Sequence, residues 1–254
     1  MKRRNTASRH GVADKIIPEP KLLSFDVFGT LIDVRSGSRA AFERILAEAG
    51  GGEGRCDPLE LWEQWEKANI RRYWDRTYHS YREICRASLQ EVFSQLHIAG
   101  NPDSIQFYFD SFAQFKRFPD VDAVLDALGT AGYKLAVVSN IDDDLLQATP
   151  LGRTFDLVCT SERARGYKPD GTLFRYLLKS SGLSINEVFH SGQSQHTDLV
   201  GGRPMGLTVA WINRRDLVLA QGVPEPSFEF DHLRPILDLL LPKGQSDMQK
   251  LTSS

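Results

Sequence analysis

Four polar residues follow apolar stretches of the sequence, and their chemistry suits covalent catalysis. Asp26 follows LLSF, Ser139 ends LAVVS, Lys168 lies in GYKPD, and Asp198 lies in HSGQSQHTD. An ionised carboxylate attacks an electrophilic carbon or phosphorus to give an ester or acyl phosphate, which water then cleaves. Because ligands of open parallel sheets bind outside the carboxyl ends of the strands, we expect the four side chains to meet at one edge.

We interpret Asp26 as the nucleophile, although an Asp after a strand often only stabilises a turn. Lys168, within about 4 Å, would keep Asp26 ionised, since a nearby opposite charge lowers the pKa of a carboxyl group by about one to three. Thr30 could orient Asp26 through its hydroxyl group or only stabilise its own turn. Asp198 could position the hydrolytic water or support Lys168.

Ser139 and Asn140 are candidate substrate-binding residues at the end of an expected strand. Their side chains, with nearby backbone amides, could hold an oxygen of a substrate carboxylate or phosphate. The alternative is that they only cap the helix that begins near Asp142.

These positions require a sheet of parallel strands that alternate with helices. Apolar, β-branched runs predict at least five strands. The first begins at Leu22, and the others are Lys134–Ser139, Phe155–Thr160, Glu187–Ser191 and Leu207–Ile212. The sequence therefore predicts an α/β fold, a doubly wound parallel sheet, with its core in residues 21–35 and 119–243.

A helical cap is expected between the first strand and the rest of the core, over residues 36–118. Ser36-Gly37-Ser38 would lead into a first helix, and Leu61, Trp65 and Ala68 mark a second. Residues Tyr81 to Leu96 mark a third helix, and Ile105, Tyr108, Phe112 and Phe115 recur at the spacing of a further helix.

One segment of the expected cap, WEKANIRRYWDR, concentrates basic and aromatic residues. Arg71 and Arg72 offer planar forks to an anion, and Trp65 and Trp74 could exclude water around it. The alternative, equally supported by the residues, is a helix with a solvated basic face.

Composition favours a small-molecule substrate over nucleic acid or a membrane. The 254 residues include 31 basic and 33 acidic side chains, so no overall charge attracts polyanions. Three widely spaced cysteines fit a reducing compartment, and we expect the cytoplasm. Residues 1–20 are interpreted as a disordered basic arm and residues 244–254 as a flexible tail; a homodimer is one option for assembly.

The ordered motifs at Asp26, Ser139-Asn140, Lys168 and Asp198 resemble those of the haloacid dehalogenase (HAD) superfamily. Within it, the chain is most similar to 2-haloacid dehalogenases with a helical cap inserted after the first strand. The resemblance covers about Lys21 to Leu241. It implies a hydrolase with an aspartate nucleophile and a covalent ester intermediate, acting on a small, carboxylated substrate at a carbon with a halide or another leaving group.

Two positions distinguish branches of this superfamily. Phosphatases carry a second Asp two residues after the nucleophile, where this chain has Phe28, and dehalogenases carry an aromatic residue there. Phosphatases also bind Mg²⁺ through an Asp where this chain has Gln193, and Gln193 and Gln195 could hold a water instead. The resemblance thus implies that no metal or other cofactor is needed.

Two alternatives remain open. One is a Mg²⁺-dependent phosphatase that binds the metal through Asp26, the backbone carbonyl of Phe28, and Asp198. The other is an inactive protein that uses the cleft for binding. In the cap, the resemblance aligns Trp65-Glu66 with a Trp-Arg pair, so the halide-binding Arg of the dehalogenases would be absent or supplied by Arg71 or Arg72.

Overall fold

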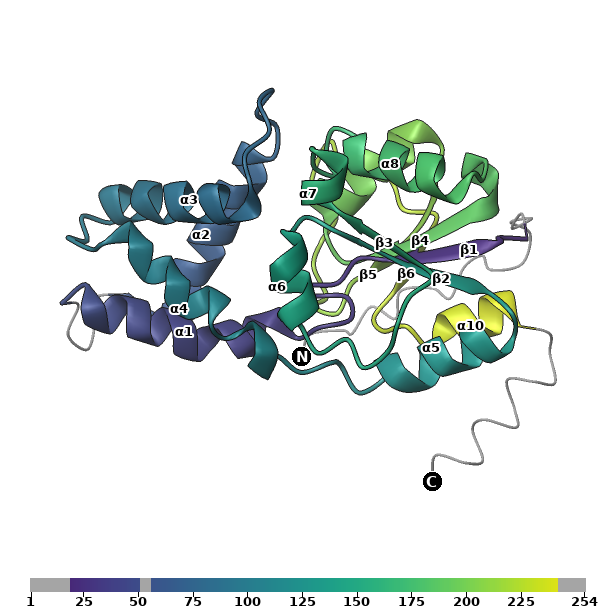
Figure 1. Ribbon diagram of the computed structural model, residues 1–254, viewed down its shortest axis with the longest axis horizontal. Coiled ribbons are helices and arrows are strands. Elements are labelled where there is room, and N and C mark those ends of the chain that lie inside the picture. Colours follow the sequence, from purple (N-terminus) through teal and green to yellow (C-terminus); the bar gives the residue numbers. More distant parts are fainter. Residues whose placement is uncertain (1–18, 51–55, 242–254) are drawn as a thin grey trace, which may run out of the picture.

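The computed structural model describes residues 19–50 and 56–241, which form a parallel sheet with helices on both faces (Figure 1). The strand order is β3-β2-β1-β4-β5-β6. The strands are β1 (Leu22–Phe25), β2 (Lys134–Ser139), β3 (Leu157–Thr160), β4 (Val188–Gly192), β5 (Thr208–Ile212) and β6 (Phe228–Phe230). This confirms the predicted doubly wound sheet and adds β6, an edge strand that the sequence pattern did not indicate.

β1 lies between β2 and β4 in the sheet and ends slightly before them. Phe25 pairs with Val137 of β2 and Ser191 of β4. The backbone N–H of Asp26 donates to the carbonyl oxygen of Ser191 at 2.9 Å, which continues the ladder by one residue. Asp26 therefore emerges at the carboxyl edge of the sheet, between β2, which ends at Ser139, and β4, which ends at Gly192.

The two faces of the sheet are covered by different helices (Figure 1). Leu23 and Phe25 belong to the apolar cluster that includes α5 (Val121–Thr130) and α10 (Pro235–Leu240). Leu22 belongs to a second cluster with α8 (Thr172–Ser181). Because both faces are buried, the strands carry nearly continuous apolar runs. Short helices α6 (Asp143–Ala148), α7 (Ser161–Ala164) and α9 (Val200–Gly202) complete the core.

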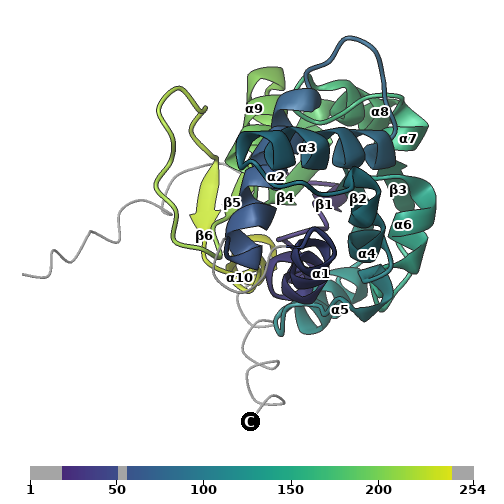
Figure 2. The same cartoon turned by 90° about the vertical axis from the view of Figure 1, so that its left-hand side faces the viewer.

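A helical cap lies beyond the carboxyl edge of the sheet, as Figures 1 and 2 show. It contains α1 (Val34–Glu48), α2 (Pro58–Arg72), α3 (Tyr81–Gln95) and α4 (Gln106–Phe109), with 3₁₀ turns η1 (Pro102–Ile105) and η2 (Phe112–Gln114). Asp57 accepts hydrogen bonds from the first turn of α2, and Ser80 and Glu83 form a capping box on α3. These side chains determine where the helices begin, because they satisfy backbone donors that lack partners inside the helix.

Two features of the cap differ from the sequence prediction. Helix α1 begins at Val34 and includes Ser36-Gly37-Ser38, because Asp33 caps it through the Ser36 N–H and Gly37 lets the Phe115 ring approach closely. The residues from Ile105 to Phe115 form short 3₁₀ and α turns rather than one helix. Both kinds of turn bring residues three or four apart to one side, so apolar spacing alone could not separate them.

Two of the places where the cap contacts the core involve backbone hydrogen bonds. Near the nucleophile, the two connecting segments pair, since Asp33 N–H donates to Lys116 O at 2.8 Å and Phe118 N–H donates to Leu31 O at 3.0 Å. At the other place, the Asp142 carboxylate accepts hydrogen bonds from the backbone N–H groups of Tyr81 (2.8 Å) and Arg82 (3.0 Å) at the start of α3. A core residue thus satisfies donors of a cap helix.

Other expectations from the sequence concern the chain ends and the cysteines. Residues 1–18 and 242–254, which hold most of the expected arm and tail, lie outside the described residues, as do residues 51–55. Cys56, Cys85 and Cys159 are free thiols. Within residues 19–50 and 56–241, no helix has the length and apolar character needed to cross a membrane.

We predict that Gly37→Ala destabilises the protein even though Ala favours helices. A Cβ at Gly37 would collide with the buried Phe115 ring, and overpacking of this kind costs about 1–3 kcal/mol. Urea unfolding should show the loss, whereas Ser36→Ala, an exposed position in the same turn, should change the free energy of unfolding by less than about 0.5 kcal/mol. A Gly37→Ala protein more stable than the wild type would contradict this packing.

Candidate active site

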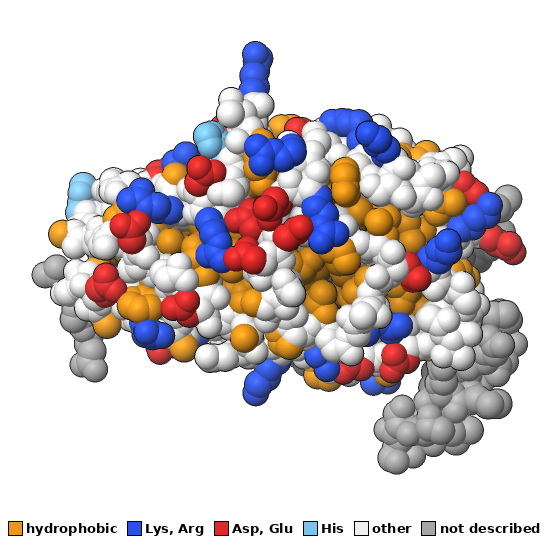
Figure 3. Space-filling view, in the orientation of Figure 1, with side chains coloured by type: hydrophobic (Ala, Val, Ile, Leu, Met, Phe, Trp, Pro, Cys, Tyr) orange, Lys and Arg blue, Asp and Glu red, His pale blue; other side chains and the backbone are white. Residues whose placement is uncertain are grey.

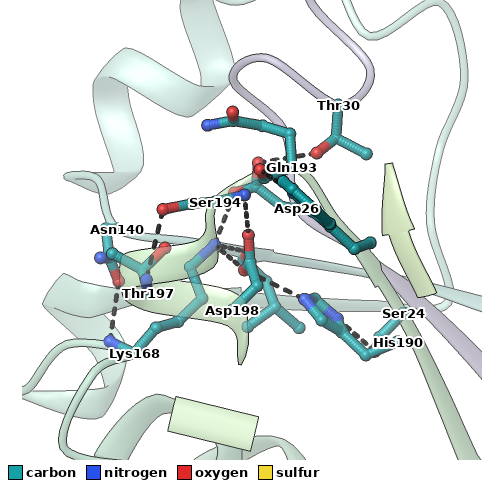
Figure 4. A network of polar contacts seen from close by, with 12 residues as sticks. Ser24, Asp26, Thr30, Asn140, Lys168, His190, Gln193, Ser194, Thr197 and Asp198 are labelled. Atoms are coloured by element: carbon teal, nitrogen blue, oxygen red, sulfur yellow. Dashed lines mark hydrogen bonds and ion pairs between the residues drawn. The ribbon is translucent and has the colours of Figure 1, made fainter. Parts of the chain in front are cut away.

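A buried lysine bridges two carboxylates at the carboxyl edge of the sheet (Figure 4). Lys168 Nζ lies 2.5 Å from Asp26 Oδ1 and 2.8 Å from Asp198 Oδ1. It also donates to the backbone carbonyl of Val138 at 3.3 Å. All three hydrogens of the ammonium group therefore have acceptors, which offsets the cost of burying its charge.

The second oxygen of Asp26 is held by Thr30, whose hydroxyl group donates to Oδ2 at 2.9 Å. The tight turn between them depends on Gly29, which has φ 89°. A Cβ at Gly29 would lie 2.7 Å from Cγ of Gln193, so the close approach also requires glycine. The structure thus brings Asp26, Thr30 and Lys168 together as the sequence predicts.

His190 holds Asp198, and Ser24 in turn holds His190; sequence reasoning missed both residues. His190 Nε2 lies 3.1 Å from Asp198 Oδ1, and His190 Nδ1 lies 2.9 Å from Ser24 Oγ. Since an ionised carboxylate only accepts hydrogen bonds, we assign the proton to Nε2. The backbone N–H of Ser194 donates to the other oxygen of Asp198 at 2.9 Å. The only sequence signal for His190 and Ser24 is a polar residue inside each of two buried strands.

The pKa values of Asp26, Asp198 and Lys168 depend on both burial and the charges of neighbouring residues. Burial raises the pKa of Asp26 above its usual value, because desolvation and repulsion by Asp198 outweigh the attraction of Lys168. Burial also acts to raise the pKa of Asp198, but the attraction of Lys168 and the hydrogen bond from His190 lower it overall. Burial acts to lower the pKa of Lys168, and the two carboxylates raise it overall. Lys168 therefore lowers the pKa of Asp26 as predicted, but not enough to bring it below its usual value.

Asp26 and Lys168 face a cavity of about 80 Å³ between the sheet edge and the cap. On the face shown in Figure 3, hydrophobic side chains lie at the surface where the cap meets the core. The cavity is lined from the core by Phe28, Ser139, Asn140, Gln193, Ser194 and Thr197, and from the cap by Val34, Trp62, Trp65, Glu66, Asn69, Ile70, Tyr73, Tyr81 and Tyr108. The expected core residues Ser139, Asn140 and Gln193 thus lie with the nucleophile.

Asn140 and Gln195 have structural contacts that sequence reasoning did not anticipate. The Asn140 side-chain oxygen accepts a hydrogen bond from the Lys168 backbone at 3.0 Å, which fixes the loop that carries the lysine. Gln195 does not line the cavity. Its side chain donates to Val218 O at 3.2 Å and accepts from Ala220 N–H at 2.7 Å, so it holds the loop after β5 rather than a water.

The cap residues proposed from the sequence separate into two groups. Trp65 and Glu66 line the cavity, although Trp65 is mainly a packing residue that donates to Cys85 O at 2.9 Å. Arg71 and Arg72 instead form ion pairs with Glu91 at 2.5 and 2.8 Å, away from the cavity. Trp74 is 53% exposed and also lies outside the cavity lining. The expectation that these last three contact a substrate is corrected, because they face other sides of α2 and its end.

Two further cap residues in the cavity wall carry polar atoms ready for a ligand. Trp62 Nε1 and Asn69 Oδ1 are buried and have no hydrogen-bond partner among the described residues. Buried polar atoms without partners are rare and costly, and in a cavity wall they suit a bound polar group. Both lie on the same side of α2 as Glu66.

Phe28 anchors the cap rather than donating a proton. Its ring makes edge contacts with Phe112 and Phe115, with centroids 5.4 and 6.4 Å apart. The position two residues after the nucleophile therefore combines an apolar wall of the cavity with the packing of the cap on the core.

The residues around Asp26 do not fit a divalent cation well. The Lys168 ammonium group already lies between the two carboxylates that would have to bind the metal. Both oxygens of Asp198 are engaged in hydrogen bonds, and Gln193 offers a neutral amide. Hard divalent cations favour several carboxylate or water oxygens, and the described residues here offer few carboxylate oxygens that are not already bonded.

Comparison with known proteins agrees with this geometry. Residues 23–212 match the family model described as haloacid dehalogenase-like hydrolase. The chain belongs to this family. It is therefore a HAD-superfamily hydrolase, and several of its relatives lie in the L-2-haloacid dehalogenase branch.

Among curated relatives, (S)-2-haloacid dehalogenase 4A of Burkholderia cepacia is 28% identical over 218 residues, covering 83% of this chain and 87% of the relative. A crystal structure described as a dehalogenase has 22% identity and a TM-score of 0.76, covering 90% of this chain and all of that one. The structure of the L-2-haloacid dehalogenase of Xanthobacter autotrophicus with covalently bound chloropropionic acid has 20% identity and a TM-score of 0.70, covering 92% of this chain and 98% of that one. The structural matches support the fold of this HAD hydrolase.

Glu66 should make the stability of this hydrolase depend on pH. Burial against the cavity wall raises the pKa of Glu66 from 4.5 to about 7, although Arg215 partly opposes this. The unfolded chain loses this proton near the ordinary value, so the folded state becomes less stable as the pH rises from about 4.5 to 7. Above that window the full penalty is present.

We predict that Glu66→Gln removes this penalty. In urea unfolding at pH 8.5, the variant should be more stable than the wild type by on the order of 2 kcal/mol. This is less than the full pKa shift implies, because Glu66 is partly exposed and solvent screens its charge. At pH 4 the advantage should vanish. Glu60→Gln, an exposed position on the same helix, should show no pH-dependent gain. An equal effect of Glu66→Gln at both pH values would contradict the interpretation.

Proposed function

We propose that this HAD hydrolase displaces a leaving group, such as a halide, from carbon in a small carboxylated substrate, with Asp26 as the nucleophile. One observation carries the proposal. The Asp26 carboxylate is fixed by Lys168 and Thr30 beside a small cavity, whereas the position that would supply an acid to a leaving alcohol is occupied by Phe28. Halides leave without a proton, so the missing acid does not hinder their departure.

In the first step, an oxygen of Asp26 attacks the substrate carbon, and the bond to the leaving group breaks. This forms an ester with Asp26 and releases the leaving group as an anion. Thr30 and Lys168 hold the two oxygens of the Asp26 carboxylate in place at the cavity wall, and this fixed position lowers the entropic cost of the reaction.

In the second step, water attacks the carbonyl carbon of the Asp26 ester. The bond between this carbonyl carbon and the bridging oxygen, which Asp26 contributed in the first step, breaks; this releases the hydroxy acid and restores the carboxylate with one oxygen from water. A proton passes to solvent, so the net reaction is R–X plus water to R–OH, a proton and X⁻. Lys168 stabilises the negative charge that develops on the ester oxygen.

The substrate carboxylate has several donors within the same cavity. Ser139, the Asn140 amide and the unpaired Trp62 Nε1 surround it from the core and the cap. The relatives are named as 2-haloacid dehalogenases, which supports a carboxylate of this kind in the substrate of this protein. Phe28 and Val34 supply the apolar wall for the carbon atoms.

We predict that Asp26→Asn lowers kcat by at least about a thousandfold without loss of fold, because the amide is nearly isosteric but a far poorer nucleophile. In a single turnover in ¹⁸O water, the label should appear on Asp26 of the wild type before it appears in product. Asp122→Asn, an exposed carboxylate in an ion pair with Arg117, serves as the control and should retain activity. Full activity of undeamidated Asp26→Asn would refute the covalent mechanism.

We predict that activity on halogenated acids survives EDTA, since Lys168 supplies the positive charge at the site. A panel of small halogenated and phosphorylated acids, assayed with EDTA and with added Mg²⁺, tests this. Hydrolysis of phosphate esters that is lost on chelation would favour the Mg²⁺-dependent phosphatase. Tight binding of acids with no turnover and no adduct on Asp26 would favour an inactive binding protein.

A further inference from the structure

A second cavity adjoins the catalytic one and is larger, at about 210 Å³. It lies between the side of α2 that faces the core and the loop after β5, which run near one another in Figure 2. Val34, Trp62, Glu66 and Gln193 line both cavities. Because the two share these wall residues, a ligand on Asp26 could extend from one into the other by small rotations of side chains.

The size of the catalytic cavity argues for such an extension. At about 80 Å³ it is small beside the roughly 300–1,000 Å³ of typical ligand pockets. Gly29, three residues after the nucleophile, lines the second cavity, so the turn that carries Asp26 leads from one space to the other. A substituent on the reacting carbon therefore has room in this direction.

The chemistry of the second cavity favours a neutral apolar group. Trp62, Phe118, Ile212 and Leu217 form much of its wall. The basic side chains at its edge are already paired. Arg214 binds Asp120 at 3.0 Å and the carbonyl oxygen of Thr30, while Arg35 and Arg215 share Glu63 at 3.4 and 3.1 Å. An anionic group would have to compete with these carboxylates.

The wall formed by the loop after β5 is preorganised. Asn213 Nδ2 donates to Leu217 O at 2.9 Å, and Leu217 N–H donates to Asn213 Oδ1 at 2.8 Å. Gln195 holds the next turn through Val218 and Ala220. Leu217 is 38% exposed, which leaves apolar surface for a ligand to cover. A fixed apolar wall binds a ligand without a large ordering cost.

We propose that the second cavity, termed here the side-chain pocket, binds an apolar substituent on the reacting carbon, so that the preferred substrates are 2-substituted acids with a branched or aromatic side chain. This proposal rests on the proposed function and specifies its substrate class. Gln195 and Asn213 are positioning residues for the pocket, since they hold the loop that carries Leu217.

The test compares 2-chloropropionate with 2-chloro-3-phenylpropionate. The wild type should have at least a tenfold higher kcat/KM for the phenyl substrate, in line with the roughly 10–200-fold discrimination that apolar pockets achieve. Leu217→Trp should fill the pocket and lower kcat/KM for the phenyl substrate at least tenfold, while kcat/KM for 2-chloropropionate stays unchanged. Leu217→Ala should instead favour still longer substituents.

Val218→Trp is the matched control, because Val218 is adjacent, 88% exposed and outside the pocket lining. It should leave both kcat/KM values unchanged. A wild-type preference for 2-chloropropionate, or an equal effect of Leu217→Trp on both substrates, would overturn the side-chain pocket while leaving the proposed reaction intact.

Binding of unreactive 3-phenylpropionate, measured by calorimetry, separates the pocket from the reaction. Binding by the wild type that weakens at least tenfold in Leu217→Trp supports the pocket even if no chlorinated acid is turned over, in which case only the proposed reaction fails. No binding to the wild type, or equal binding to both proteins, overturns the pocket.

Discussion

A lysine ammonium group enclosed by two carboxylates is the interaction on which the rest of the site depends. Burial of any one of these charges alone would be costly, and removal of one partner from such a group typically costs about 3–5 kcal/mol. Asp26, Lys168 and Asp198 come from three segments at the carboxyl edge of the sheet, so the energy of the group also holds these segments together. His190 and Ser24 extend the same constraint into two neighbouring strands.

The cap completes the site that the core begins. The core supplies the fixed charges, and α2 supplies the wall opposite them. Phe28 joins the two, since its backbone follows the nucleophile and its ring packs on Phe112 and Phe115. The choice of an aromatic residue there therefore affects both the leaving groups that the site can accept and the placement of the cap.

The sheet and the residues at its edge could be predicted from the sequence because their positions depend on local patterns. Asp26 directly follows β1, and Lys168 and Asp198 lie in the segments that follow β3 and β4, so all three come from the carboxyl ends of parallel strands. His190 could not be assigned, because its role depends on Asp198 eight residues away and on Ser24 in another strand. The direction of the Asp26 pKa also requires the degree of burial, which no motif contains.

In the cap, helical phase decided which predictions held. The cavity is lined by Trp62, Trp65, Glu66, Asn69 and Tyr73, which recur at the spacing of one side of a helix. Arg71 and Arg72 fall between these positions and turn towards Glu91. The cap also meets the core at two ends, and aromatic rings hold both of them. At one end Phe28 packs on Phe112, and at the other Tyr167 of the core stacks on Tyr73 of the cap, with centroids 4.6 Å apart, beside the hydrogen bonds from α3 to Asp142. Because separating either group of rings would expose apolar surface to water, the cap resists opening at both ends.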